Sequence, residues 1–166
     1  MHEVIDPKTL FLEEDELVPN NPVFPVLIYL QVLDRQAEAK DRIFQDRFAA
    51  NGWAGIWRNG IFTYHHFHPD AHEALGIARG RVEVQLGGPS GQRLSLQEGD
   101  LLVLPAGTGH RNLSASEDLL VIGAYPKGQE EYTTLREKIA RAAVAKVPRP
   151  QTDPFYGKDG PLLRAW

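Results

Sequence analysis

Between residues 53 and 126, short hydrophobic runs alternate with polar residues and are separated by glycine-rich breaks. Apolar side chains occupy every second position in 82–86 and again in 93–96, the pattern of strands with one buried face. The runs 101–104 and 119–122 are apolar throughout, as in strands covered on both faces. Many short strands at close spacing predict a β-barrel or a double-sheet jelly roll across residues 53–126.

Two stretches outside this region have the spacing of amphipathic helices. Residues 36–50 carry apolar side chains three to four positions apart and end at an Asn-Gly pair at 51–52, a natural helix stop. Residues 130–144 return to the same spacing. Residues 24–33 are apolar and rich in β-branched side chains, which predicts a strand. We therefore expect one strand and one helix before the barrel and one helix after it.

The two ends of the chain are rich in proline. The first 22 residues combine prolines with an acidic run, which favours an extended arm whose acidic side chains face solvent. Beyond residue 148 there are too many prolines and glycines for a helix or a central strand, and the aromatic residues there indicate packing along the barrel. A chain of 166 residues is the size of one domain. We predict a single domain made of an arm (1–22), a strand and helix (23–52), a barrel (53–126), and a helix and tail (127–166).

Composition narrows the classes of partner and of site. The chain is 24% charged with a net charge of -4, and its basic residues are scattered, so we expect neither nucleic acid nor membrane as a partner. It contains no cysteine, which excludes disulfides and thiolate metal sites. The N-terminal residues lack the pattern of a signal peptide, and no segment approaches the roughly 20 apolar residues of a membrane span. We expect a cytoplasmic protein.

Histidine is concentrated in one stretch of the sequence. Five of the six histidines are His65, His66, His68, His72 and His110. On a strand, side chains two positions apart share a face, so His66 and His68 point the same way. A turn at 68–70 can bring Glu73, at the start of the next strand, to the same point. Imidazole and carboxylate groups at this spacing predict a metal site without sulfur.

The spacing of this cluster resembles the two sequence motifs of the cupin superfamily. The fixed positions of the first motif are held by Gly60, His66, His68, Glu73 and Gly80. The second motif is matched by Gly99, Pro105, Gly107 and His110. The asparagine that this motif expects after its histidine is out of register, because Asn112 follows His110 after only one residue. The resemblance covers about the middle half of the chain, residues 60–110.

The resemblance implies a mainly β cupin fold, a double-stranded β-helix or jelly-roll barrel, with one helix before and one after it. It implies one divalent metal ion, of Fe, Mn, Ni, Co or Zn, held by His66, His68, Glu73 and His110. It also implies that glycines at 80 and 107 permit tight turns. More loosely, the chain is similar to an uncharacterised group of bacterial single-domain metal-binding cupins. Cupins usually dimerise, and the apolar strand 26–33 is our candidate for pairing in a homodimer.

Open metal positions favour a metal-dependent enzyme that acts on a small molecule, with dioxygenase-like chemistry. In that scheme Glu73 is the general base, and Tyr64 or Asn112 orients the substrate. Two alternatives stay open at this point. One is a metal-dependent sugar isomerase or epimerase, and the other is a non-catalytic cupin that binds a small ligand or a metal.

Several nearby residues also have purely structural interpretations. We expect His65 to face outward, and His72 to be a surface or rim residue, unless a different register makes it a ligand. The alternative for Tyr64 is that it is only a packing residue in the barrel. Trp53 and Trp57, four positions apart, are expected in the core or at an interface.

Overall fold

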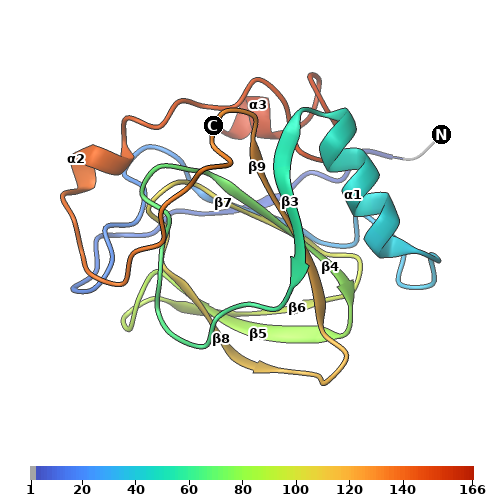
Figure 1. Ribbon diagram of the computed structural model, residues 1–166, viewed down its shortest axis with the longest axis horizontal. Coiled ribbons are helices and arrows are strands. Elements are labelled where there is room, and N and C mark those ends of the chain that lie inside the picture. Colours follow the sequence, from blue (N-terminus) through green and yellow to red (C-terminus); the bar gives the residue numbers. More distant parts are fainter. Residues whose placement is uncertain (1–2) are drawn as a thin grey trace.

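The computed structural model describes residues 3–166, so the first two residues of the predicted arm lie outside it. Within that range its strands are β1 (Lys8–Leu10), β2 (Val26–Tyr29), β3 (Trp53–Asn59), β4 (Glu73–Arg79), β5 (Arg81–Leu86), β6 (Gln92–Gln97), β7 (Leu101–Leu104), β8 (His110–Ala115) and β9 (Leu120–Pro126). The larger sheet has the order β1-β2-β7-β4-β9-β3 and the smaller has the order β6-β5-β8. Neighbouring strands are antiparallel, and the two sheets face each other (Figure 1).

The predicted alternation reflects burial between the two sheets. In β5 the side chains of Val82, Val84 and Leu86 are buried, while the intervening residues are partly exposed or exposed. β7 and β9 are buried on both faces, as their unbroken apolar sequences predict. The apolar side chains between the sheets form one core, made of Leu12, Val26, Ile28, Leu75, Ile77, Val82, Val84, Leu86, Leu96, Leu102, Leu104 and Val121.

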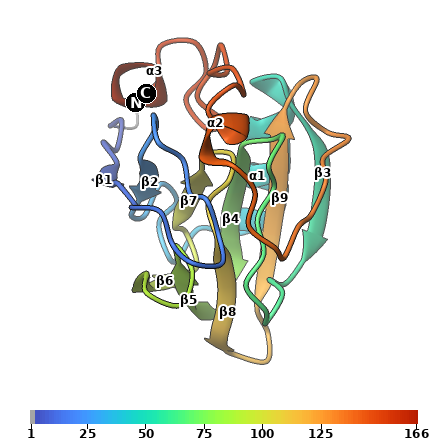
Figure 2. The ribbon, with the colours of Figure 1, turned by 90° about the vertical axis from the view of Figure 1, so that its left-hand side faces the viewer.

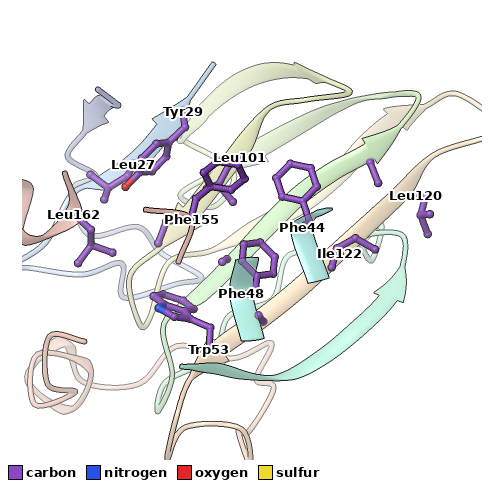
Figure 3. Close-up of a cluster of buried hydrophobic side chains, with 14 residues drawn as sticks. Leu27, Tyr29, Phe44, Phe48, Trp53, Leu101, Leu120, Ile122, Phe155 and Leu162 are labelled. Atoms are coloured by element: carbon purple, nitrogen blue, oxygen red, sulfur yellow. The ribbon is translucent and has the colours of Figure 1, made fainter. Parts of the chain in front are cut away.

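A second core lies on the outer face of the larger sheet, beneath helix α1 (Lys40–Ala50). Phe44 and Phe48, one helical turn apart, are fully buried there, and Phe155 of the C-terminal tail packs 6.0 Å from Phe44, between ring centroids (Figure 3). The helix approaches the sheet closely at Gly76 of β4, where a Cβ atom would lie 2.6 Å from the Phe44 ring. α1 begins four residues later than predicted and ends at the predicted Asn-Gly stop.

The helix predicted after the barrel is much shorter than expected. It is reduced to α2 (Arg141–Val144), and residues 130–140 are irregular. The reason is tertiary: Leu135 exchanges two backbone hydrogen bonds, of 2.9 and 3.0 Å, with Phe67. A helical residue would bond these backbone groups within its own helix.

The C-terminal tail adds a further short helix, α3 (Leu162–Ala165), where we expected none. Figures 1 and 2 show α2 and α3 at the end of the molecule away from β5, β6 and β8. Within residues 3–166, none of the helices is both long enough and apolar enough to cross a membrane.

The N-terminal arm is packed more deeply than its composition predicts. Asp15 of the acidic run is 5% exposed, and its carboxylate accepts backbone N–H groups of Leu17 and Ser90. The guanidinium of Arg141 in α2 donates to the carbonyls of Leu12 and Pro19. The acidic run is therefore not simply a solvated face, because one of its members anchors the arm to the barrel.

The backbone of β2 is not free to pair with a second copy. It is bonded to β1 on one side and to β7 on the other, and the edges of the larger sheet are β1 and β3. The suggestion that this strand pairs across a dimer is therefore wrong. The homodimer itself stays a prediction and would need another surface.

Substitution of Gly76 by alanine tests the close approach of α1. We expect Gly76→Ala to lower the free energy of unfolding by about 1–3 kcal/mol, because the new methyl group overpacks against the Phe44 ring. Gly60→Ala is the control, since a Cβ there meets no heavy atom of the described chain within 4 Å. Urea denaturation measures both variants. Equal stability of the two would contradict the packing described for α1.

Candidate metal centre

Three buried histidines meet at one end of the barrel. His110 begins β8, and His66 lies beside it in a segment that is extended but forms only isolated bridges instead of the predicted strand. His66 and His110 exchange backbone hydrogen bonds of 3.2 and 3.0 Å. His68, two positions further on, takes the same face, as strand parity predicts. Possible ligand atoms of the three side chains lie within 4.8 Å of one another, so the cluster could hold a metal ion.

Backbone carbonyls orient all three imidazole rings. The Nδ1 atoms of His66, His68 and His110 each lie 3.0 Å from a carbonyl oxygen, those of Tyr64, Thr133 and Thr108 respectively. A carbonyl can only accept a hydrogen bond, so each Nδ1 is the protonated nitrogen. In a neutral ring the lone pair is then on Nε2. The backbone thereby selects the tautomer that a metal ion needs.

Glu73, the first residue of β4, adds a carboxylate beside two of these histidines. Its Oε2 lies 3.3 Å from His68 Nε2, and its Oε1 lies 3.3 Å from His110 Nε2. The hydroxyl of Tyr125 donates to Oε2 at 2.6 Å. Oε1 is buried and has no hydrogen-bond partner within residues 3–166. A buried, unpartnered carboxylate oxygen is costly, and a bound cation would compensate it.

The pKa values of His68 and His66 are shifted in opposite directions. Burial raises the pKa of Glu73, but the neighbouring His68 and His110 outweigh burial and hold that pKa well below its ordinary value. Burial lowers the pKa of His68, but Glu73 outweighs it and raises the pKa above its ordinary value. Burial and the nearby His110 lower the pKa of His66 to about 3. The carboxylate of Glu73 thus favours a proton on His68, whereas His66 is held neutral.

The cluster faces a cavity of about 420 Å³. Its walls are mainly apolar and aromatic, formed by Trp57, Ile61, Phe62, Leu75, Tyr125 and Tyr132, with Asn59 and Thr134 as polar members. Arg58 also borders the cavity, but its Nη1 donates to Asp41 of α1 at 2.8 Å, on the outer side of the larger sheet. Among the described lining residues, the histidines are therefore the basic side chains that face the interior.

Sequence reasoning missed Tyr125 and the position of Trp57. Ala74 of β4 pairs with Ala124 of β9, so Tyr125 lies directly across from Glu73 on the inner face of the sheet. Trp57 reaches the same face because a register shift between Ala54 and Trp57 adds one residue to β3. Pairing of β4 with β9 would have placed Tyr125 beside Glu73. The alternation of apolar and polar residues in the sequence does not indicate the bulge that moves Trp57 to the inner face.

Two predicted substrate-orienting residues do not line the cavity. The Tyr64 ring stacks on Phe62, with 4.9 Å between centroids, and the Arg136 guanidinium lies 4.1 Å above it. Asn112 pairs with Val84 in the smaller sheet, and neither Tyr64 nor Asn112 is among the described residues that form the cavity walls. The geometry thus gives no support to a substrate-orienting role for either side chain.

The remaining histidines differ from the cluster. His72 is fully buried, so its predicted position at the surface or rim is wrong. Its Nδ1 accepts the N–H of Ala106 at 2.9 Å, which leaves Nε2 protonated to donate to the Pro148 carbonyl at 3.0 Å. Both nitrogens are used, so His72 is a structural residue in this register. His65 is half-buried outside the cavity.

Comparisons with known proteins agree with the two motifs. A family model described as a cupin domain matches residues 54–122. The uncharacterised protein YjlB of Bacillus subtilis (strain 168) is 37% identical over 164 residues, covering 96% of each chain.

Solved structures resemble the fold more distantly. Acireductone dioxygenase from Bacillus anthracis, with a cadmium ion in its active centre, is 17% identical, with a TM-score of 0.43 over 63% of this chain and 79% of that one. Oxalate decarboxylase from Bacillus subtilis is 16% identical, with a TM-score of 0.35 over 72% of this chain and 29% of that one. These low scores carry no argument about activity. The full-length similarity to YjlB and the domain match over the barrel show that the chain belongs to the cupin superfamily, with the mainly β cupin fold that its motifs predict.

Proposed function

We propose that this cupin binds one divalent metal ion through His66, His68, His110 and Glu73, and that it is a dioxygenase-like enzyme acting on a small molecule. The observation that carries the proposal is the common orientation of the three imidazoles, whose Nδ1 atoms all donate to backbone carbonyls. The Nε2 atoms of His68 and His110 thereby lie beside Glu73, and all three histidines border an open cavity. A purely structural metal site would be closed.

The donor set fits a first-row transition metal. Three nitrogen donors and one carboxylate oxygen suit Fe, Mn, Co, Ni or Zn and leave positions for substrate in an octahedral arrangement. Such an ion supplies Lewis-acid polarisation and, where it is redox-active, electron transfer. Despite burial, His68 and His110 hold the pKa of Glu73 well below its ordinary value, which keeps the carboxylate ionised and ready to bind a cation.

The cavity walls favour a flat, largely apolar substrate with an oxygen donor. Trp57, Tyr132 and Phe62 offer aromatic surfaces for such a body, and the polar end would face the histidine cluster. A sugar needs many hydrogen-bonding partners. Among the described lining residues, the polar wall groups besides the tyrosines, the cluster and Arg58, whose guanidinium bonds Asp41 outside, are Asn59 and Thr134. The walls therefore favour the dioxygenase-like hypothesis over a sugar isomerase or epimerase. In a dioxygenation the substrate supplies the electrons and receives both oxygen atoms, so no separate reductant is required.

Metal stoichiometry tests the ligand set. We expect the metal-reconstituted protein to hold one ion per chain, because possible ligand atoms of the three histidines lie within 4.8 Å of one another and Glu73 lies 3.3 Å from two of them. His110→Gln should weaken binding by more than the roughly 10–100-fold that loss of an outer hydrogen-bonding partner costs. His72→Gln is the matched control and should retain the ion, because both nitrogens of His72 are bonded elsewhere. Elemental analysis after dialysis measures all three proteins, and loss of the ion in the control alone would contradict the assignment.

Metal binding should be accompanied by proton release. Nδ1 of His68 is bonded to Thr133, so the proton that its raised pKa retains is on Nε2, the atom that the ion needs. Metal affinity should therefore fall as the pH is lowered through the pKa of His68, which lies above the ordinary histidine value, and level off at higher pH. Calorimetric titration in two buffers of different ionisation enthalpy counts the released protons. Affinity that does not change with pH would refute this competition.

Dioxygen uptake tests the activity itself. Protein loaded separately with iron, manganese and zinc should be assayed with enols and with hydroxylated aromatic compounds. We expect uptake with a redox-active metal, and its loss in the His110→Gln variant but not in His72→Gln. Tight zinc binding without uptake under any loading would favour the non-catalytic alternative and would contradict the proposed enzyme.

A further inference from the structure

Within residues 3–166, the only hydrogen bond that the Glu73 carboxylate receives from outside the histidine cluster comes from Tyr125. We propose that Tyr125 is a positioning residue that keeps Glu73 a ligand through one oxygen, Oε1, and so preserves an open metal position for substrate. This inference rests on the proposed metal site and adds to it the residues that control how the carboxylate binds. It concerns Tyr125 and Trp57, neither of which belongs to the cupin motifs.

The direction of the Tyr125 hydroxyl is determined by its other partner. Trp57 Nε1 lies 2.8 Å from the hydroxyl oxygen, and an indole N–H can only donate. The Tyr125 oxygen must accept there, which leaves its own proton for Glu73 Oε2 at 2.6 Å. The chain from Trp57 through Tyr125 to Glu73 therefore runs in one direction. It ends on Oε2 of the carboxylate and leaves Oε1 without a hydrogen-bond partner among residues 3–166.

Packing holds Tyr125 in this position. It lies on β9 directly across from Glu73 on β4, on the inner face of the larger sheet. Its ring stacks against Tyr132, with 4.0 Å between centroids and 28° between planes. The side chain is 1% exposed, so its hydroxyl has little freedom to leave the carboxylate.

Two glycines allow the backbone to place Trp57 for this contact. Gly55 has a φ of 63°, and it lies within the bulge that moves Trp57 to the inner face. A Cβ at Gly55 would also lie 2.9 Å from Glu130 Cβ. The Trp57 indole lies against Gly123 of β9, where any Cβ would overlap the ring. The bulge in β3 and Gly123 on the neighbouring β9 thus both allow the hydrogen bond from Trp57 to Tyr125.

The consequence concerns the number of metal positions that Glu73 takes. A carboxylate can bind a metal ion through one oxygen or through both. With Oε2 engaged by Tyr125, binding through Oε1 satisfies both oxygens and leaves the adjacent position open. Without the hydroxyl, Oε2 has no such partner and can turn to the ion, which closes that position.

Cobalt(II) and azide provide a test that does not depend on activity. The visible spectrum of cobalt(II) reports its coordination number, and azide reports whether a position is open. We expect Tyr125→Phe to retain one cobalt ion, to change the cobalt spectrum and to bind azide about 10-fold more weakly than the unmodified protein. Trp57→Phe should shift both readouts in the same direction, by less.

Tyr64→Phe is the matched control. It removes a hydroxyl from a ring that lies at a similar distance from the cluster, with 5.7 Å between the Tyr64 and His66 ring centroids, against 6.0 Å for Tyr125 and His68. It leaves the bond from His66 Nδ1 to the backbone carbonyl of residue 64 in place. Its cobalt spectrum and azide affinity should match those of the unmodified protein.

The outcomes separate this inference from the proposed function. If the unmodified protein does not bind cobalt, the proposed metal site is wrong. If it binds cobalt and Tyr125→Phe has the same spectrum and azide affinity, the metal site stands and the role of Tyr125 is refuted. Should Tyr125→Phe fail to fold by circular dichroism, Trp57→Phe decides, and an unchanged spectrum and azide affinity in that variant would overturn the inference.

Discussion

The candidate site depends on three hydrogen bonds from imidazole Nδ1 atoms to backbone carbonyls. The carbonyls belong to residues 64, 108 and 133, which lie in three separate segments of the chain. Thr133 lies in the irregular stretch 130–140, so its carbonyl is not used within a helix. The stretch is held in place by the bridge between Leu135 and Phe67. The irregular stretch after the barrel therefore orients His68, because its carbonyl at residue 133 accepts the Nδ1 proton.

The larger sheet provides the acidic side of the site. Its register places Glu73 and Tyr125 across from each other, and the bulge in β3 adds Trp57 to the same inner face. Helix α1 covers the outer face of these strands, where Phe44 packs against Gly76. The acidic side of the site is thus built on strands supported by a core on each face, which suits precise placement of its side chains.

Features with a local periodic signal were predictable from the sequence. Alternation identified the barrel strands, and parity with a turn brought His66, His68 and Glu73 to one region. Features that depend on a distant partner were missed. The spacing of 130–144 predicts a helix, but pairing of Leu135 with Phe67 overrides it over most of that length. Trp57 changes face through a bulge, and His72 is buried by partners at positions 106 and 148, so neither outcome has a nearby signal in the sequence.

The proposed metal site requires three imidazoles and one carboxylate to face a single metal position. A crystal structure of the cobalt-loaded protein, with anomalous scattering recorded at the cobalt edge, would locate that position. We expect one anomalous peak bonded to Nε2 of His66, His68 and His110 and to Oε1 of Glu73, with Oε2 still bonded to Tyr125. A peak elsewhere, or cobalt bound through an Nδ1 atom of the cluster, would contradict it.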